Sequence, residues 1–153
     1  MLLSRDELVS ALFCETDRVQ RLKMPLALIA VGLMERAGSE AELTKVSHDM
    51  AVRGIVGRMT GIWRCYDSVG KLADGELLLL LPGCTVAHAR TLAERLRDEV
   101  FALPIETGGG DLLVKACFGV ASSGGRSPFV VLREIEKALQ EARAAGPGSI
   151  QCL

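Results

Sequence analysis

The sequence lacks an excess of basic charge, since 18 Lys and Arg oppose 19 Asp and Glu for a net charge of −1. Non-specific binding to nucleic acid or anionic lipid needs a positive field, so any nucleotide contact here must be local. Long hydrophobic runs are also missing, because the apolar segments 26–34 and 77–81 fall far short of the ~20 residues of a membrane span. Charged residues at Arg5, Asp6 and Glu7 come too early for a signal peptide. We therefore expect a cytoplasmic protein without membrane insertion.

Cysteine pairs and histidine clusters are absent as well. The five cysteines are odd in number and contain no CxxC pair, which predicts neither a disulfide framework nor a zinc site. We interpret all five as small buried hydrophobic residues: Cys14, Cys65, Cys84, Cys117 and Cys152. The two histidines, His48 and His88, have no partner at metal-ligand spacing, so we expect both to be structural or exposed. No metal or cofactor is predicted.

A β-hairpin signal is present in residues 64–82. Two apolar-rich arms, at 69–72 and 77–81, flank Asp74-Gly75, a pair typical of a tight type I′ turn. The second arm is apolar at every position, which predicts a central strand covered on both faces. We expect this hairpin to be the core of a single domain over residues 1–153, a length that can bury roughly 70% of the surface of the unfolded chain.

Four helices are expected around this hairpin. Capping boxes at Ser4/Glu7 and Ser39/Glu42 predict two helix starts. Ser127-Pro128 predicts a third start, of a helix that Gly146-Pro147 stops. In the second helix, Gly54 and Gly57 indicate close packing against a neighbour. The expected helices run from Ser4 to about Leu22, from Ser39 to about Trp63, from Val86 to Val100 and from Ser127 to Gly146.

The strands expected between these helices complete the fold class. Besides the hairpin arms, residues 26–33 and 112–121 are predicted strands, and 149–153 could form a short last strand. The glycines at 108–110 lack the spacing of a phosphate loop and are expected to form a flexible loop. The order of elements predicts an α+β sandwich with a mostly antiparallel sheet.

This order and the hairpin resemble the GGDEF family, the diguanylate cyclase domains that make cyclic di-GMP from two GTP. The family pattern Arg-x-x-Asp, five residues, Gly-Gly-Asp/Glu-Glu-Phe is similar to Arg64-Cys-Tyr-Asp67, five residues, Ala73-Asp74-Gly75-Glu76-Leu77. Segments Leu80–Pro82, Ala93–Arg97, Cys117–Ala121 and Ala138–Gly146 match at family spacing. The resemblance covers essentially the whole chain and implies a nucleotide-cyclase-like palm with flanking helices.

The resemblance implies that the metal site of the family has been lost. Family members hold Mg²⁺ with carboxylates at the positions of Gly32 and Gly75, and neither glycine can ligate through a side chain. Asp74 replaces a glycine that lets the nucleotide approach the backbone, and its charge opposes phosphate. A working cyclase is therefore not expected.

Other catalytic positions are partly retained. Glu76 survives at the fourth signature position, and Asp49 corresponds to an aspartate that contacts guanine in the family. Glu40 replaces the neighbouring guanine-contacting asparagine. Arg143 replaces a phosphate-binding lysine, which keeps the charge but not the shape. Asp49 could also be a solvated helix residue, and Glu76 could solvate the turn.

The family's inhibitory site, by contrast, is matched residue by residue. That site binds cyclic di-GMP through Arg-x-x-Asp and an arginine on the following helix, which correspond to Arg64, Asp67 and Arg95. Arginine can bond guanine O6 and N7 or grip phosphate oxygens, and a carboxylate can accept from guanine N–H groups. Arg18, with Arg21 close by, could supply the arginine that the family takes from a second domain.

Two hypotheses from different classes follow. The first is a non-catalytic cyclic di-GMP receptor that converts ligand level into a change of homodimer state or protein partner. The second is a ligand-free scaffold whose helices bind another protein. In the second case Arg64 would pair with Asp67, and Arg95 with Asp98 or Glu99, as ordinary surface ion pairs.

Overall fold

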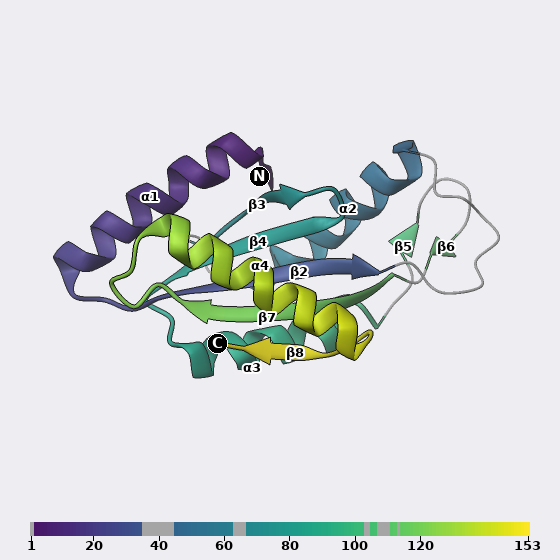
Figure 1. The fold of residues 1–153 in the computed structure, drawn as a ribbon. Helices are drawn as coiled ribbons and strands as arrows, with labels where there is room; N and C mark the ends of the chain where they lie inside the picture. Colours follow the sequence, from purple (N-terminus) through teal and green to yellow (C-terminus); the bar gives the residue numbers. More distant parts are fainter. Residues whose placement is uncertain (1, 35–44, 63–66, 103–104, 107–110, 113) are drawn as a thin grey trace.

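The fold was examined in a computed structural model that describes residues 2–34, 45–62, 67–102, 105–106, 111–112 and 114–153, with backbone alone for 45–51, 105–106 and 111–112. Its main sheet has six strands in the order β1-β3-β4-β2-β7-β8 (Figure 1). The strands are β1 (Leu2–Leu3), β2 (Leu26–Met34), β3 (Ser68–Ala73), β4 (Glu76–Pro82), β7 (Lys115–Ser122) and β8 (Ile150–Cys152).

Three central pairings of this sheet are antiparallel, those of β3 with β4, β4 with β2, and β2 with β7. The two outer pairings, β1 with β3 and β7 with β8, are parallel. The sheet is therefore mixed with an antiparallel majority, and the predicted α+β palm-like class is confirmed. The all-apolar arms predicted as central strands are β2 and β4, in the middle of the sheet.

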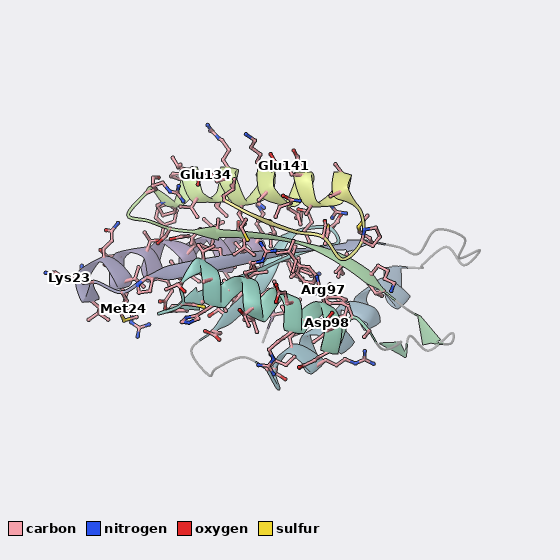
Figure 2. All side chains as sticks on the ribbon, turned by 90° about the horizontal axis from the view of Figure 1, so that it is seen from below. Lys23, Met24, Arg97, Asp98, Glu134 and Glu141 are labelled. Atoms are coloured by element: carbon pink, nitrogen blue, oxygen red, sulfur yellow. The ribbon has the colours of Figure 1, made fainter. Side chains whose placement is uncertain are left out.

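Helices cover both faces of the sheet (Figure 1). Alternate residues of β2 and β4 face two separate cores: one packs against α2 (Lys45–Met59) and α3 (Val86–Arg95), the other against α1 (Arg5–Leu22) and α4 (Pro128–Ala145). Seen along the sheet, α4 and α3 lie on opposite sides (Figure 2). This two-sided cover explains why both strands are apolar at every position.

The predicted helix starts at Ser4 and Ser127 are confirmed. The Ser4 hydroxyl accepts from the Glu7 N–H, and the Glu7 carboxylate accepts from the Ser4 N–H, which is a complete capping box. Ser127 caps α4 with Pro128 at its first position, and α4 ends at Gly146. The predicted start at Ser39/Glu42 lies outside the described residues.

Several boundaries differ from the sequence prediction. Helix α2 ends at Met59 rather than near Trp63, and the third helix divides into α3 and a π-helical turn, η1 (Leu96–Val100). The strand expected at 112–121 is two elements, because β6 (Asp111–Leu112) pairs with β5 (Ile105–Glu106) in a separate small sheet. The glycine loop at 108–110 lies outside the described residues.

The hairpin turn was predicted with the wrong type. A type I′ turn needs positive φ at both central residues. Gly75 has φ 71°, but the φ of Asp74 is not positive. A register shift between Lys71 and Ala73 accompanies this turn, because a bulge supplies the twist that the turn lacks.

Close packing at Gly57 was also a wrong interpretation. A Cβ at this exposed position would meet nothing within 4 Å. Gly119 is one of the glycines that do pack tightly, because its Cβ would lie 2.9 Å from the Leu139 backbone nitrogen of α4.

The cysteines and His88 complete the comparison with the sequence. Cys84 and Cys117 are buried as predicted, whereas Cys14 and Cys152 are exposed, so that part of the interpretation is wrong. His88 is exposed, as expected. Within the described ranges, each helix is too short or too polar to cross a membrane.

The Gly119 contact generates a stability prediction. Gly119→Ala should lower the free energy of unfolding by about 1–3 kcal/mol, because the backbone of α4 cannot rotate away from the added methyl group. Gly57→Ala is the matched control and should raise it by about 0.5–1 kcal/mol, since alanine is the better helix former. Urea unfolding measures both, and equal values for the two variants would contradict the packing of α4 on β7.

Candidate functional site

The turn of the hairpin and the end of β2 lie side by side. Gly32 of β2 is paired with Glu76 of β4, and the Leu33 N–H donates to the Gly75 carbonyl at 2.8 Å. The structure therefore brings together Gly32, Gly75 and Glu76, three positions that the family resemblance assigns to the active site. Asp74 is exposed at the turn beside them.

Arg143 of α4 reaches into this cluster. Its Nη2 lies 3.4 Å from Glu76 Oε1, and its Nη1 donates to the Leu33 carbonyl at 3.5 Å. The two side chains are 33% and 25% exposed, so the ion pair is only partly shielded from solvent. Sequence reasoning placed Arg143 at a phosphate-binding position but missed its pairing with Glu76, which is 67 residues away in the chain.

Cys117 of β7 is the strand partner of Gly32 and lies beside the cluster. Its Sγ lies 3.7 Å from the Gly32 carbonyl oxygen. Burial raises the pKa of the Cys117 thiol, and the nearby Arg143 charge opposes this rise. The thiol is therefore protonated at neutral pH and acts as a small buried side chain.

These residues do not fit a magnesium ion. Mg²⁺ is held by carboxylate and other oxygen ligands in a nearly octahedral arrangement, yet Gly32 and Gly75 have no side-chain oxygen and Glu76 is paired with Arg143. Across the part of the chain with described side chains, no three His, Cys, Asp or Glu residues are grouped as metal ligands.

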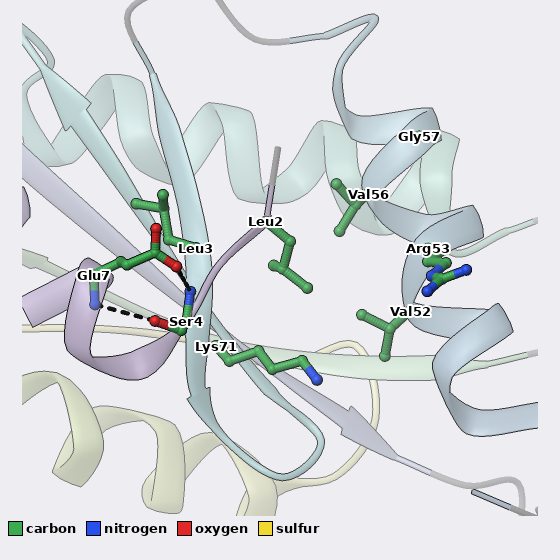
Figure 3. A pocket seen from close by; sticks show the side chains of 9 residues that line it. All are labelled: Leu2, Leu3, Ser4, Glu7, Val52, Arg53, Val56, Gly57 and Lys71. Atoms are coloured by element: carbon green, nitrogen blue, oxygen red, sulfur yellow. Dashed lines mark hydrogen bonds between the residues drawn. The ribbon is translucent and has the colours of Figure 1, made fainter. Parts of the chain in front are cut away.

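A pocket of about 660 Å³ lies between α2, β3 and the N-terminal strand β1 (Figure 3). The Lys71 side chain extends from β3 toward α2, where Val52 and Arg53 lie. Sequence reasoning missed this pocket, because β1 is a two-residue strand without a periodic signal. Its lining combines apolar with polar and charged residues: Leu2, Leu3, Ser4, Glu7, Val52, Arg53, Val56, Gly57 and Lys71.

Asp67, one of the three predicted inhibitory-site residues, lies at the other end of the hairpin. Asp67 directly precedes β3, whose first residue Ser68 pairs with Leu80, whereas the turn lies beyond Ala73. Arg64 lies outside the described residues. Arg95 ends α3, and its guanidinium pairs with Glu99 at 3.4 Å on the surface. The predicted Arg95–Glu99 pair is therefore present, while Asp98 pairs with Arg97.

A contact of Arg58 connects the end of α2 with η1, the turn that follows α3. Arg58, near the end of α2, donates to the Val100 carbonyl of η1 at 3.1 Å. The end of α2, which leads through 63–66 to Asp67, thus lies against the continuation of α3. Arg95 stands at the junction of α3 and η1.

Four further residues that the sequence analysis discussed are less informative. Arg18 lies on α1, pairs with Glu15 at 3.2 Å, and belongs to the helix layer opposite α3. Asp49 and His48 lie on α2, but their side chains are outside the described set, and so is all of Glu40. The structure does not place Arg18 beside Arg95 within one chain.

Comparison with known proteins agrees with this geometry. Residues 44–149 match the family model described as diguanylate cyclase, GGDEF domain. Diguanylate cyclase DgcP of Pseudomonas aeruginosa is 28% identical over 99 residues, which are 64% of this chain and 15% of that protein. This chain therefore spans about 15% of the length of that curated relative.

Solved structures share the fold. Diguanylate cyclase SiaD of P. aeruginosa, solved in complex with its activator SiaC, is 26% identical with a TM-score of 0.82, covering 99% of this chain and 59% of SiaD. The GGDEF domain of DgcB from Caulobacter crescentus, in complex with c-di-GMP, is 15% identical with a TM-score of 0.84, covering 99% of this chain and 88% of that one.

The fold and the hairpin define a nucleotide-cyclase-like palm domain. More specifically, the chain belongs to the GGDEF family, because the family match covers more than half of its 153 residues.

The capping box beside the pocket generates a prediction with a pH dependence. Ser4→Ala should lower the free energy of unfolding by about 1 kcal/mol at pH 7, because the first turn of α1 loses its cap. The pKa of Glu7 lies below its ordinary value because the carboxylate accepts from the Ser4 backbone N–H. The stabilisation that the Glu7 carboxylate contributes is present above the pKa that Glu7 has in the unfolded chain. It is lost as the pH falls through the lowered pKa that Glu7 has in the folded chain.

Urea unfolding of Glu7→Gln between acid and neutral pH checks the direction of this pH dependence. The variant should lose less stability in acid than the unmodified chain, because it has no carboxylate to protonate at position 7. Ser10→Ala, at an exposed position inside α1, is the control and should not destabilise. An acid sensitivity unchanged by Glu7→Gln would argue against the capping role.

Proposed function

We propose that residues 1–153 form one degenerate GGDEF domain that acts in the cytoplasm as a non-catalytic receptor for cyclic di-GMP. Arg64, Asp67 and Arg95 bind the dinucleotide without a metal ion. Binding changes either the oligomeric state of the chain or its contact with a protein partner.

The observation that supports this function best is the separation of the two ends of the hairpin. The changes that oppose catalysis, at Gly32, Asp74 and Gly75, all lie at the turn. Asp67 lies at the opposite end of β3, close in sequence to the matched arginine of the inhibitory site. Loss of catalysis at the turn therefore leaves the other end free to keep its own ligand.

The chemistry of the retained residues suits a cyclic dinucleotide. A guanidinium can bond O6 and N7 of guanine in the plane of the base, and Asp67 can accept from guanine N1–H and N2–H. The Arg58–Val100 contact supports the convergence of these residues, because it holds the end of α2 against η1.

The surface pair of Arg95 with Glu99 does not prevent this role. Both side chains are about half exposed, and an exposed i, i+4 pair contributes only about 0.3–0.5 kcal/mol. A ligand that offers guanine or phosphate oxygens can therefore displace Glu99 at little cost.

Two relatives provide a precedent for the proposed ligand and for a protein partner. The DgcB domain was solved with c-di-GMP, and SiaD was solved with its activator protein SiaC. A protein partner or a second copy could read the bound state here. Because Arg18 lies on the layer opposite Arg95, it would contribute only from a second copy.

A ligand-free scaffold is the alternative function, and one observation favours it. Phe13 of α1 and Phe129 of α4 are 40% and 66% exposed, and their rings meet edge-on at 5.2 Å between centroids. Such an apolar contact at the surface of two helices could serve a protein partner. In this case Arg64, Asp67 and Arg95 would only solvate the surface.

Calorimetric titration with cyclic di-GMP distinguishes the two functions. The unmodified chain should bind with a Kd on the order of 1 µM, about −8 kcal/mol. Arg95→Ala and Arg64→Ala should each weaken binding at least about tenfold, because a charged hydrogen-bond partner of the ligand is lost. Arg90→Ala is the matched control, since Arg90 lies on the same helix and pairs with Glu94 in the same i, i+4 manner.

Absence of heat at roughly 100 µM ligand, about a hundredfold above the expected Kd, would favour the scaffold. Equal weakening by Arg90→Ala and Arg95→Ala would also speak against a site at Arg95.

The enzymatic function is tested with GTP. Incubation with GTP and Mg²⁺ should give no cyclic di-GMP, because Gly32 and Gly75 offer no ligand to the metal. Chromatography of the nucleotides measures this directly. Product that appears with the unmodified chain and disappears in Glu76→Gln would overturn the proposed loss of catalysis.

A further inference from the structure

The guanidinium of Arg143 lies directly against the backbone of Gly32. A Cβ built at Gly32 would be 3.0 Å from Arg143 Nη2 and 3.1 Å from both Arg143 Cζ and Cys117 Sγ. Gly32 is not among the glycines with positive φ, so its backbone would accept any residue. The close approach of Arg143 and Cys117 therefore explains why position 32 has no side chain.

Arg143 is also held by two oxygen atoms from different strands. Glu76 of β4 supplies the carboxylate at 3.4 Å, and Leu33 of β2 supplies a carbonyl at 3.5 Å. The side chain thus links α4 to the two central strands at the place where both leave the core. Its positive charge is paired with the carboxylate of Glu76.

We propose that the Arg143 guanidinium is a built-in cation that takes the space and the charge of a divalent metal ion at the end of β2. It occupies the volume that a side chain at position 32 would need, and it neutralises Glu76. A metal ion at this place would have to displace the guanidinium, because two cations held close together on one partly buried carboxylate repel each other. The Arg143 guanidinium is thus a second reason, besides the missing ligands, why this site does not fit a metal ion.

This inference goes beyond the proposed ligand binding and does not rest on it. Cyclic di-GMP binding depends on residues at the entrance of the hairpin, whereas the built-in cation involves its turn. Either can fail while the other holds, because metal binding and dinucleotide binding are measured separately.

The test is to remove Arg143, to add a carboxylate at position 32, and to titrate the variant with Mn²⁺. The electron paramagnetic resonance signal of the free ion reports binding. Gly32→Asp/Arg143→Ala should bind Mn²⁺ with a Kd on the order of 1 mM or tighter, as for weak carboxylate sites. The unmodified chain and Gly32→Asp should not bind under the same conditions, because Arg143 pairs with the carboxylates. Gly32→Asp/Arg133→Ala, which removes an exposed arginine of the same helix, is the matched control and should not bind.

Mn²⁺ binding by the unmodified chain, or equally by Gly32→Asp with Arg143 in place, would overturn the proposal. So would a correctly folded Gly32→Asp/Arg143→Ala variant that binds no Mn²⁺.

A second measurement uses milder variants in case the double variant does not fold. Gly32→Ala should lower the thermal unfolding midpoint by roughly 4 °C or more, because Arg143 and Cys117 must both move. In the Arg143→Ala background the same change should lower it by less than half as much, since Cys117 can turn into the vacated space. An equal drop in both backgrounds would contradict the contact between Gly32 and Arg143.

Discussion

Strand β2 is hydrogen-bonded to a neighbour on each side and covered by helices on each face, and the other elements are placed around it. All residues from Leu26 to Val31 are fully buried. Ala27, Ile29 and Val31 belong to the core under α2 and α3, whereas Leu26, Leu28 and Ala30 belong to the core under α1 and α4. A strand buried in this way tolerates no shift of register, because a one-residue slip would exchange its two faces. Gly32 is the next residue of the series that faces α4.

The chemistry of the domain is arranged at the two ends of the hairpin that β2 supports. At the turn, Gly32 and Glu76 are brought together by strand pairing, and Arg143 reaches them from α4. At the entrance, Asp67 precedes β3, and Arg58 near the end of α2 donates to the Val100 carbonyl of η1. Because the length of β3 separates these ends, a change of side chains at one need not disturb the other. In the proposed function, this separation allows the entrance to keep a ligand site although Gly32 and Gly75 at the turn offer no side-chain ligand to a metal ion.

Elements with local signals were predicted well from the sequence. The all-apolar strands, the capping box at Ser4 and the Pro128 start of α4 depend on residues that are close in the chain, and the structure confirms them. Strand β1 exists only because it pairs with β3, and the turn type depends on a bulge, so neither could be derived from residue types. In the candidate site, family spacing predicted which positions belong to the turn cluster, but the Arg143–Glu76 pair depends on how α4 packs. The roles of Arg64, Asp67 and Arg95 stay predictions.

The central claim, that a ligand site at the hairpin entrance persists beside a closed turn, is tested most directly by nuclear magnetic resonance of the arginine side chains. Guanidinium signals of the ¹⁵N-labelled chain would be followed during titration with cyclic di-GMP. The account predicts that the signals of Arg64 and Arg95 shift and saturate together while that of Arg143 stays in place. Shifts centred on Arg143, or no shift of any arginine signal at saturating ligand, would contradict it.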